Sequence, residues 1–144
     1  MTTNNETYLK IDLNSVQHNY KFIKSLLKSD TKILAVIKAF AYGHEDVAIA
    51  KKLENEGVNY FAVAYVKEGI RLRNHGITTP ILVLHPQKND AQTCFQYKLE
   101  PSIYSFAMLE NFKSFFNAQL IENFPIHLKF NTGLNRLGFR WEDI

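Results

Sequence analysis

Residues 32–44 read Lys32-Ile33-Leu34-Ala35-Val36-Ile37-Lys38-Ala39-Phe40-Ala41-Tyr42-Gly43-His44. The first half of this stretch is apolar without alternation, which predicts a strand buried on both faces of a parallel sheet. The apolar run ends at Lys38, and a helical pattern begins near Glu45. Parallel α/β proteins carry their chemistry at the C-terminal ends of their strands. A lysine there is more often a solvated cation, but near a buried strand end it can become a neutral, nucleophilic amine.

Composition indicates a soluble globular protein of one domain. The chain has 144 residues, 46% of them hydrophobic and 22% charged, which is enough for an ordinary core. The basic residues (17 against 14 acidic) are dispersed, so we expect no nucleic-acid partner and no membrane partner. The single cysteine, Cys94, excludes an internal disulfide. The histidines outside the first stretch lack metal-ligand spacing, so we expect no metal site and interpret them as surface or loop residues; they are His18, His75, His85 and His127. The polar start, residues 1–6, does not resemble a signal peptide, which favours a cytoplasmic location.

Along the chain, strand patterns alternate with helix patterns. An early alternation over residues 8–13 predicts a strand, with Asn14 as the cap of the helix that follows. A helix with Leu109, Phe112, Phe116 and Leu120 on its inner face is predicted after Ser105. Buried strands are predicted, besides the one that precedes Lys38, at residues 60–64, 81–84, 99–104 and 126–130.

This rhythm predicts a parallel sheet with right-handed crossovers. It fits a doubly wound sheet or a (β/α)8 barrel, and a whole barrel needs about 250 residues. We therefore expect an α/β fold that is the N-terminal part of a TIM-type barrel, truncated after about five parallel strands. Residues 1–7 are expected to be a flexible lead and residues 8–144 the partial barrel domain, with exposed apolar surface.

A second stretch, His127-Leu128-Lys129-Phe130-Asn131-Thr132-Gly133-Leu134-Asn135-Arg136-Leu137-Gly138-Phe139, repeats the design of the first. Lys129 comes at the end of a predicted buried strand, and Arg136 follows in a polar turn that contains glycine. Taken alone, such a turn is usually an ordinary surface connection with a solvated cation.

Taken together, the two stretches resemble the alanine racemase family, which are fold-type III enzymes that use pyridoxal phosphate. Residues 37–44 resemble the family's cofactor-lysine signature V-K-A-N-A-Y-G-H-G, and residues 128–139 resemble its K-V-D-T-G-M-x-R-x-G-F segment. Between them, residues 63–84 resemble the family's VA…EA-x-x-LR-x-x-G-I…PILVL run. The resemblance covers nearly the whole chain after residue 8.

The resemblance implies a role for four residues. Lys38 would carry pyridoxal 5'-phosphate covalently and act as one of two bases that exchange the substrate's α-proton. Tyr42 would bind the cofactor phosphate, Arg136 would contact its phenolic oxygen, and Lys129 matches a lysine that is carbamylated in some members. The implied activity of the full-length protein is conversion of L-alanine to D-alanine for cell-wall precursors, by a homodimer.

The sequence departs from the family pattern at three positions near these residues. Phe40 stands where asparagine is usual, Glu45 where glycine is usual, and Asn131 where aspartate is usual. In the family the second base and the phosphate-binding loops come later than residue 144, so residues 1–144 alone are expected to be inactive. The alternatives are a pyridoxal-phosphate carrier, a racemase of another amino acid, a decarboxylase, a D-amino-acid lyase, or an interaction module without a cofactor.

Overall fold

The computed structural model describes residues 7–143, in which helices and strands alternate. The elements are α1 Leu13–Ser25, β1 Leu34–Val36, α2 Lys38–Gly43, α3 Asp46–Asn55, β2 Tyr60–Val63, α4 Val66–Asn74, β3 Ile81–Val83, α5 Ala91–Gln96, β4 Glu100–Ile103, α6 Phe106–Ala118, β5 His127–Leu128 and the 3-10 turn η1 Trp141–Asp143. No helix within residues 7–143 is long and apolar enough to cross a bilayer.

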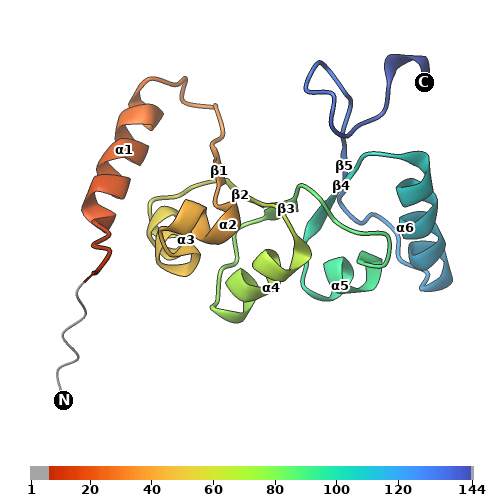
Figure 1. Ribbon diagram of the computed structural model, residues 1–144, viewed down its shortest axis with the longest axis horizontal. Helices are drawn as coiled ribbons and strands as arrows, with labels where there is room; N and C mark the ends of the chain where they lie inside the picture. Colours follow the sequence, from red (N-terminus) through yellow and green to blue (C-terminus); the bar gives the residue numbers. More distant parts are fainter. Residues whose placement is uncertain (1–6, 144) are drawn as a thin grey trace.

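Within the described residues, five strands form one parallel sheet in the order β1-β2-β3-β4-β5. Figure 1 shows α3, α4, α5 and α6 following one another in the same order along one side of the strands. A doubly wound sheet would reverse its strand order partway, whereas the strands of a barrel keep sequence order. The predicted α/β fold, the N-terminal part of a (β/α)8 barrel, is therefore confirmed.

The strand register aligns the C-terminal ends of neighbouring strands. Val36 of β1 pairs with Ala62 of β2, and Val63 of β2 pairs with Val83 of β3. The alignment continues past the strands, where the backbone N–H of His85 donates to the carbonyl of Ala64 at 2.8 Å. Residues that directly follow the strands therefore lie side by side at one edge of the sheet.

The core lies between the sheet and the helices. Its largest fully buried side chains include Phe61, Leu72 and Leu99. Arg73 of α4 is an exception among these apolar groups, because its guanidinium donates to four backbone carbonyls, those of Ile77, Thr79, Tyr97 and Lys98. Burial lowers the pKa of Arg73, and these carbonyls satisfy the partly buried cation. The side chain thus fixes the connections that lead into β3 and β4.

Three local predictions are wrong. Residues 8–13 form no strand, because the alternation finds no partner strand and Leu13 already begins α1. The helix cap is Asp12 rather than Asn14: its carboxylate accepts the N–H of Asn14 at 2.9 Å. Leu120 is 90% exposed, since α6 ends at Ala118 and Leu120 itself has a φ of 54°. The predicted lead, residues 1–7, lies outside the described residues except for its last position.

Apolar side chains are exposed on both edge strands of the sheet. Leu34 and Val36 on β1 are about two-fifths exposed, and Leu128 on β5 is 55% exposed. Phe130, just beyond β5, is exposed to a similar degree. The prediction that the strands before Lys38 and Lys129 are buried is therefore wrong, because β1 and β5 are edge strands with one neighbour each. The apolar surface expected of a partial barrel is present.

Candidate functional site

A cavity of about 420 Å³ opens at the C-terminal ends of the strands. Three of the four residues singled out from the sequence, Lys38, Lys129 and Arg136, line it together. The remaining lining residues are Ala64, Tyr65, Leu84, His85 and Leu137. The structure thus brings two amines and a guanidinium from two distant motifs to one site, which apolar and aromatic groups also line.

The sheet places both lysines. The N–H of Ile37 donates to the carbonyl of Ala62 at 2.9 Å, which continues the β1–β2 ladder up to Lys38. The N–H of Lys129 donates in the same way to the carbonyl of Ile103, also at 2.9 Å. Lys129 directly follows β5, and Lys38 follows β1 after Ile37. Each lysine therefore lies at the C-terminal end of a strand, as predicted, next to a hydrogen-bonded backbone.

Within α2, the chain after Lys38 makes a left-handed turn and not a regular right-handed helix. Ala39, Phe40, Ala41 and Tyr42 have φ between 51° and 57° and ψ between 37° and 51°. This conformation costs a residue with a Cβ about 1–2 kcal/mol, and such strain persists only where the surroundings enforce it. Glu45, with φ 68°, is the next strained position. The asparagine and glycine usual in the family at positions 40 and 45 are the residue types that adopt positive φ most readily.

The loop that carries Arg136 is closed by its own backbone. The N–H of Phe139 donates to the carbonyl of Lys129, and the N–H of Asn131 donates to the carbonyl of Phe139, both at 2.9 Å. The side-chain oxygen of Asn131 accepts the N–H of Asn135 at 2.9 Å. An asparagine oxygen can therefore take the acceptor role of the usual aspartate within this loop.

Gly138 is required for this closure. Its φ is 131°, and a Cβ there would lie 2.6 Å from the backbone nitrogen of Asn131. The close approach of the two backbones leaves no room for any side chain at position 138.

Tyr42 and His85 differ from their sequence-based interpretations. Tyr42 is 59% exposed and is not among the residues that line the cavity, so its phosphate-binding role stays a prediction. His85 lies in a loop as interpreted, but it also lines the cavity, with its ring stacked on Tyr104 at 5.5 Å and edge-on to Tyr65 at 5.5 Å. Its position directly after a buried strand was the signal that it belonged to the site.

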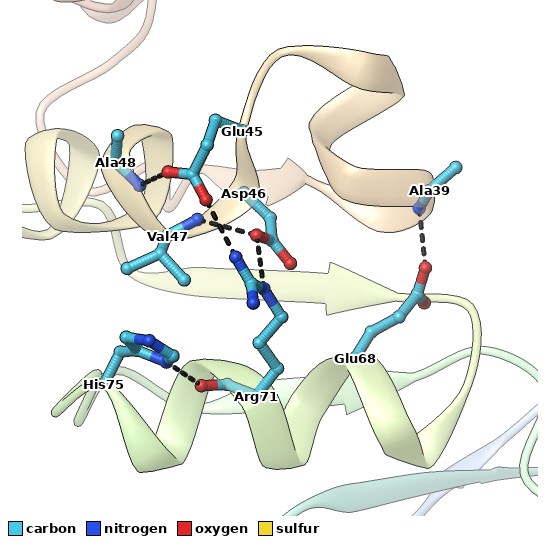
Figure 2. Close-up of polar contacts among 8 residues, drawn as sticks. All are labelled: Ala39, Glu45, Asp46, Val47, Ala48, Glu68, Arg71 and His75. Carbon is cyan, nitrogen blue, oxygen red and sulfur yellow. Dashed lines mark hydrogen bonds and ion pairs between the residues drawn. The ribbon is translucent and has the colours of Figure 1, made fainter. Parts of the chain in front are cut away.

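Polar contacts from α4 to the Lys38 segment were not foreseen from the sequence. Figure 2 shows Glu68 of α4 directed at the backbone of Ala39, and Arg71 directed at Glu45 and Asp46. The N–H of Ala48 holds the pKa of the Glu45 carboxyl below its usual value, with Arg71 contributing. The carboxylate of Asp46 raises the pKa of Arg71. The spacing from Tyr65 to Glu68, which is typical of a helix N-terminus, was the one available signal.

A second polar cluster lies at the opposite end of the sheet. Glu100 accepts hydrogen bonds from the Tyr60 hydroxyl and from His127, the latter at 2.8 Å. Burial, assisted by Glu100, raises the pKa of Tyr60. His127 therefore lies in the predicted strand and is partly exposed, and its ring is hydrogen-bonded to Glu100. Strand N-termini in barrels serve stability rather than catalysis. Within residues 7–143 no group of three or more potential ligands could hold a metal ion.

The fold and the cavity together define a class of protein: an α/β barrel segment that presents a lysine amine at the end of its first strand, beside further cations. The profile of the family described as alanine racemase, N-terminal domain, matches residues 11–144. The chain belongs to this family.

Individual relatives agree with the family profile. The chain is 36% identical over 141 residues to the alanine racemase of Geobacillus stearothermophilus, covering 96% of this chain and 35% of the relative. It is 34% identical to an amino-acid racemase of Enterococcus faecalis, covering 94% of this chain and 19% of that protein. The structure of alanine racemase from Clostridium difficile 630 superposes with a TM-score of 0.85 and 40% identity, over 90% of this chain and 34% of that one. The chain thus spans about a third of the length of the alanine racemases it matches.

Proposed function

We propose that the complete protein containing this chain is a pyridoxal-phosphate-dependent alanine racemase, which interconverts L-alanine and D-alanine. The observation that carries the proposal is the convergence of Lys38, Lys129 and Arg136 on one cavity at the C-terminal ends of parallel strands. Residues 38 and 129 belong to the two separate motifs that carry the family resemblance. The same proposal includes a cytoplasmic homodimer that supplies D-alanine for cell-wall precursors.

The residues of the cavity fit the chemistry of pyridoxal phosphate. A primary amine, which can condense with an aldehyde, is supplied by Lys38, and a cation that can pair with a phenolic oxygen is supplied by Arg136. Leu84 and Leu137 offer an apolar contact for a ring, with His85 beside them. When bound, the cofactor supplies an electron sink for a carbanion at the substrate's α-carbon.

The protein's own groups then have distinct tasks. Lys38 binds the cofactor and moves a proton at its Nζ on one face of the substrate, as a general base. Arg136 orients the ring. Lys129, the second amine of the cavity, positions Arg136 when it is carbamylated, because a carbamate accepts hydrogen bonds from a guanidinium whereas an ammonium group cannot. Racemisation needs an acid–base group on the other face as well, which we place outside residues 1–144.

The decisive experiment maps the reactive lysine. The complete protein is incubated with pyridoxal phosphate, reduced with borohydride and digested, and the labelled peptide is identified by mass spectrometry. We expect the label on Lys38 and its loss in Lys38→Arg, which keeps the charge but removes the primary amine. Lys32→Arg, at the other end of β1 and exposed, is the matched control and should label normally. Label on a different lysine would refute the assignment.

Substrate and assembly are tested on the same preparation. Racemisation of alanine by the complete protein is expected, and none by isolated residues 1–144. Because an amino-acid racemase is among the relatives, serine and other small amino acids are assayed beside alanine. If one of these amino acids reacts faster than alanine, it replaces alanine as the proposed substrate. Sedimentation of the complete protein as a monomer would contradict the homodimer.

A further inference from the structure

The left-handed turn after Lys38 is built from residues that do not favour it. Phe40 and Glu45, both at positive φ, have side chains that resist this conformation more than asparagine or glycine does. No glycine relieves the strain between Lys38 and Tyr42. Contacts from outside the segment must therefore hold it.

Glu68 of α4 fastens the beginning of the turn. One oxygen of its carboxylate accepts the N–H of Ala39, the residue after Lys38, at 2.6 Å. The other oxygen accepts the N–H of Ala64 at 2.6 Å and that of Tyr65 at 2.9 Å. One carboxylate thus joins the backbone next to Lys38 to the end of the neighbouring strand, as Figure 2 shows for Ala39.

Arg71, one helical turn further along α4, fastens the end of the segment. Its Nη2 lies 2.9 Å from Oε1 of Glu45, and its Nε lies 2.9 Å from Oδ1 of Asp46. Its guanidinium carbon lies 5.2 Å from the centre of the Phe40 ring, within the range of a cation–π contact. One side chain therefore contacts both positions at which the sequence departs from the residues that suit positive φ.

Burial distinguishes this contact from an ordinary surface ion pair. The side chain of Asp46 is 4% exposed, although that of Arg71 is 43% exposed. A buried carboxylate requires a partner, whereas exposed pairs contribute little. Residues 68 and 71 lie three apart and so share one face of the helix. Two side chains on one face of α4 therefore contact the segment, Glu68 at its beginning and Arg71 at its end.

We propose that Glu68 and Arg71 are positioning residues for Lys38. The contacts of Arg71 hold Phe40 and Glu45 at a positive φ, which their side chains do not favour. The pair keeps the turn left-handed and thereby fixes where the Lys38 amine enters the cavity. The functional part of this inference rests on the proposed function, in which Lys38 is the reactive amine. The structural part does not depend on a cofactor.

The test measures hydrogen exchange of the segment 38–45 in the complete protein without added cofactor. Because the Ala39 amide donates to Glu68, we expect Glu68→Gln to accelerate exchange there about tenfold or more. Arg71→Met should accelerate exchange across residues 39–45, and Arg71→Lys, which retains the charge, should do so less. Lys113→Met, which breaks the exposed pair of Lys113 with Glu110, is the matched control and should leave the segment unchanged.

A rescue separates positioning from general stability. Phe40→Asn and Glu45→Gly, added together to Arg71→Met, should restore slow exchange in the segment, because both new residues adopt positive φ without support. In the cofactor-loaded protein, Arg71→Met should lower kcat with little change in KM, and the rescue should recover kcat. Unchanged exchange in Arg71→Met, uniform acceleration over the whole chain, or failure of the rescue would each overturn the proposal. If borohydride labels another lysine while the exchange results are as expected, the proposed function is wrong, but the role of Glu68 and Arg71 in holding the segment 38–45 remains supported.

Discussion

Replacing Gly138 with alanine should open the loop that carries Arg136. The backbone there has φ 131°, and the added Cβ would meet the nitrogen of Asn131 at 2.6 Å and the carbonyl carbon of Phe130 at 2.7 Å. Gly133, in the same loop, has φ 134° but no atom within 4 Å of the added Cβ. Gly133→Ala therefore carries the backbone strain alone, about 1–3 kcal/mol. Gly138→Ala adds a clash with rigid backbone, about 1–3 kcal/mol more.

The difference between the two variants isolates the clash. It is measured as hydrogen exchange at the amides of Asn131 and Phe139, which close the loop through their bonds to the carbonyls of Phe139 and Lys129. An additional 1–3 kcal/mol corresponds to about 5- to 150-fold faster exchange in Gly138→Ala than in Gly133→Ala. Affinity for pyridoxal phosphate should fall more in Gly138→Ala as well. Equal exchange in the two variants would refute the close backbone contact as the reason for this glycine.

Three further predictions concern the fold. The hydrogen bond from the N–H of Asn14 lowers the pKa of Asp12 from 3.8. The negative charge of Asp12 therefore stabilises the folded chain above about pH 4, and this stabilisation is lost as the pH falls through the lower pKa of the folded state. The difference in stability between wild type and Asp12→Asn should disappear in acid, and a difference that grew in acid would contradict this prediction. Burial raises the pKa of the Cys94 thiol to about 12, so a thiol reagent at pH 8 should modify it only after denaturation, and rapid labelling of the native protein would show the thiol to be accessible. Phe61→Ala, at a fully buried position, should lower the free energy of unfolding by about 3–5 kcal/mol in urea titrations, whereas Leu120→Ala, 90% exposed, should change it by less than about 0.5 kcal/mol.

Sequence reasoning succeeded where the signal was local. A short apolar run ended by a lysine predicted a strand with Lys38 at its C-terminal end, and the same pattern placed Lys129, although these two edge strands are less buried than predicted. The repeated strand–helix rhythm predicted parallel crossovers. These features depend on burial periodicity within one segment, which the sequence states directly.

The same reasoning failed where a local signal needed a distant partner. The alternation over residues 8–13 is typical of a strand, but a strand exists only when another pairs with it. Asp12 instead caps the helix, because its carboxylate reaches two N–H groups that the helix leaves unpaired. Alternation alone cannot distinguish these outcomes.

By itself, the sequence determined the class of fold, the order of the strands and the two lysines that lie at strand ends. Only the tertiary structure decided that residues 39–42 turn left-handed, that His85 joins the cavity and that Arg71 meets Glu45, 26 residues earlier in the chain. The reason is physical: strand and helix preferences act over a few neighbouring residues. The contacts that stabilise a strained turn form only when the parallel crossovers bring α4 beside the end of β1.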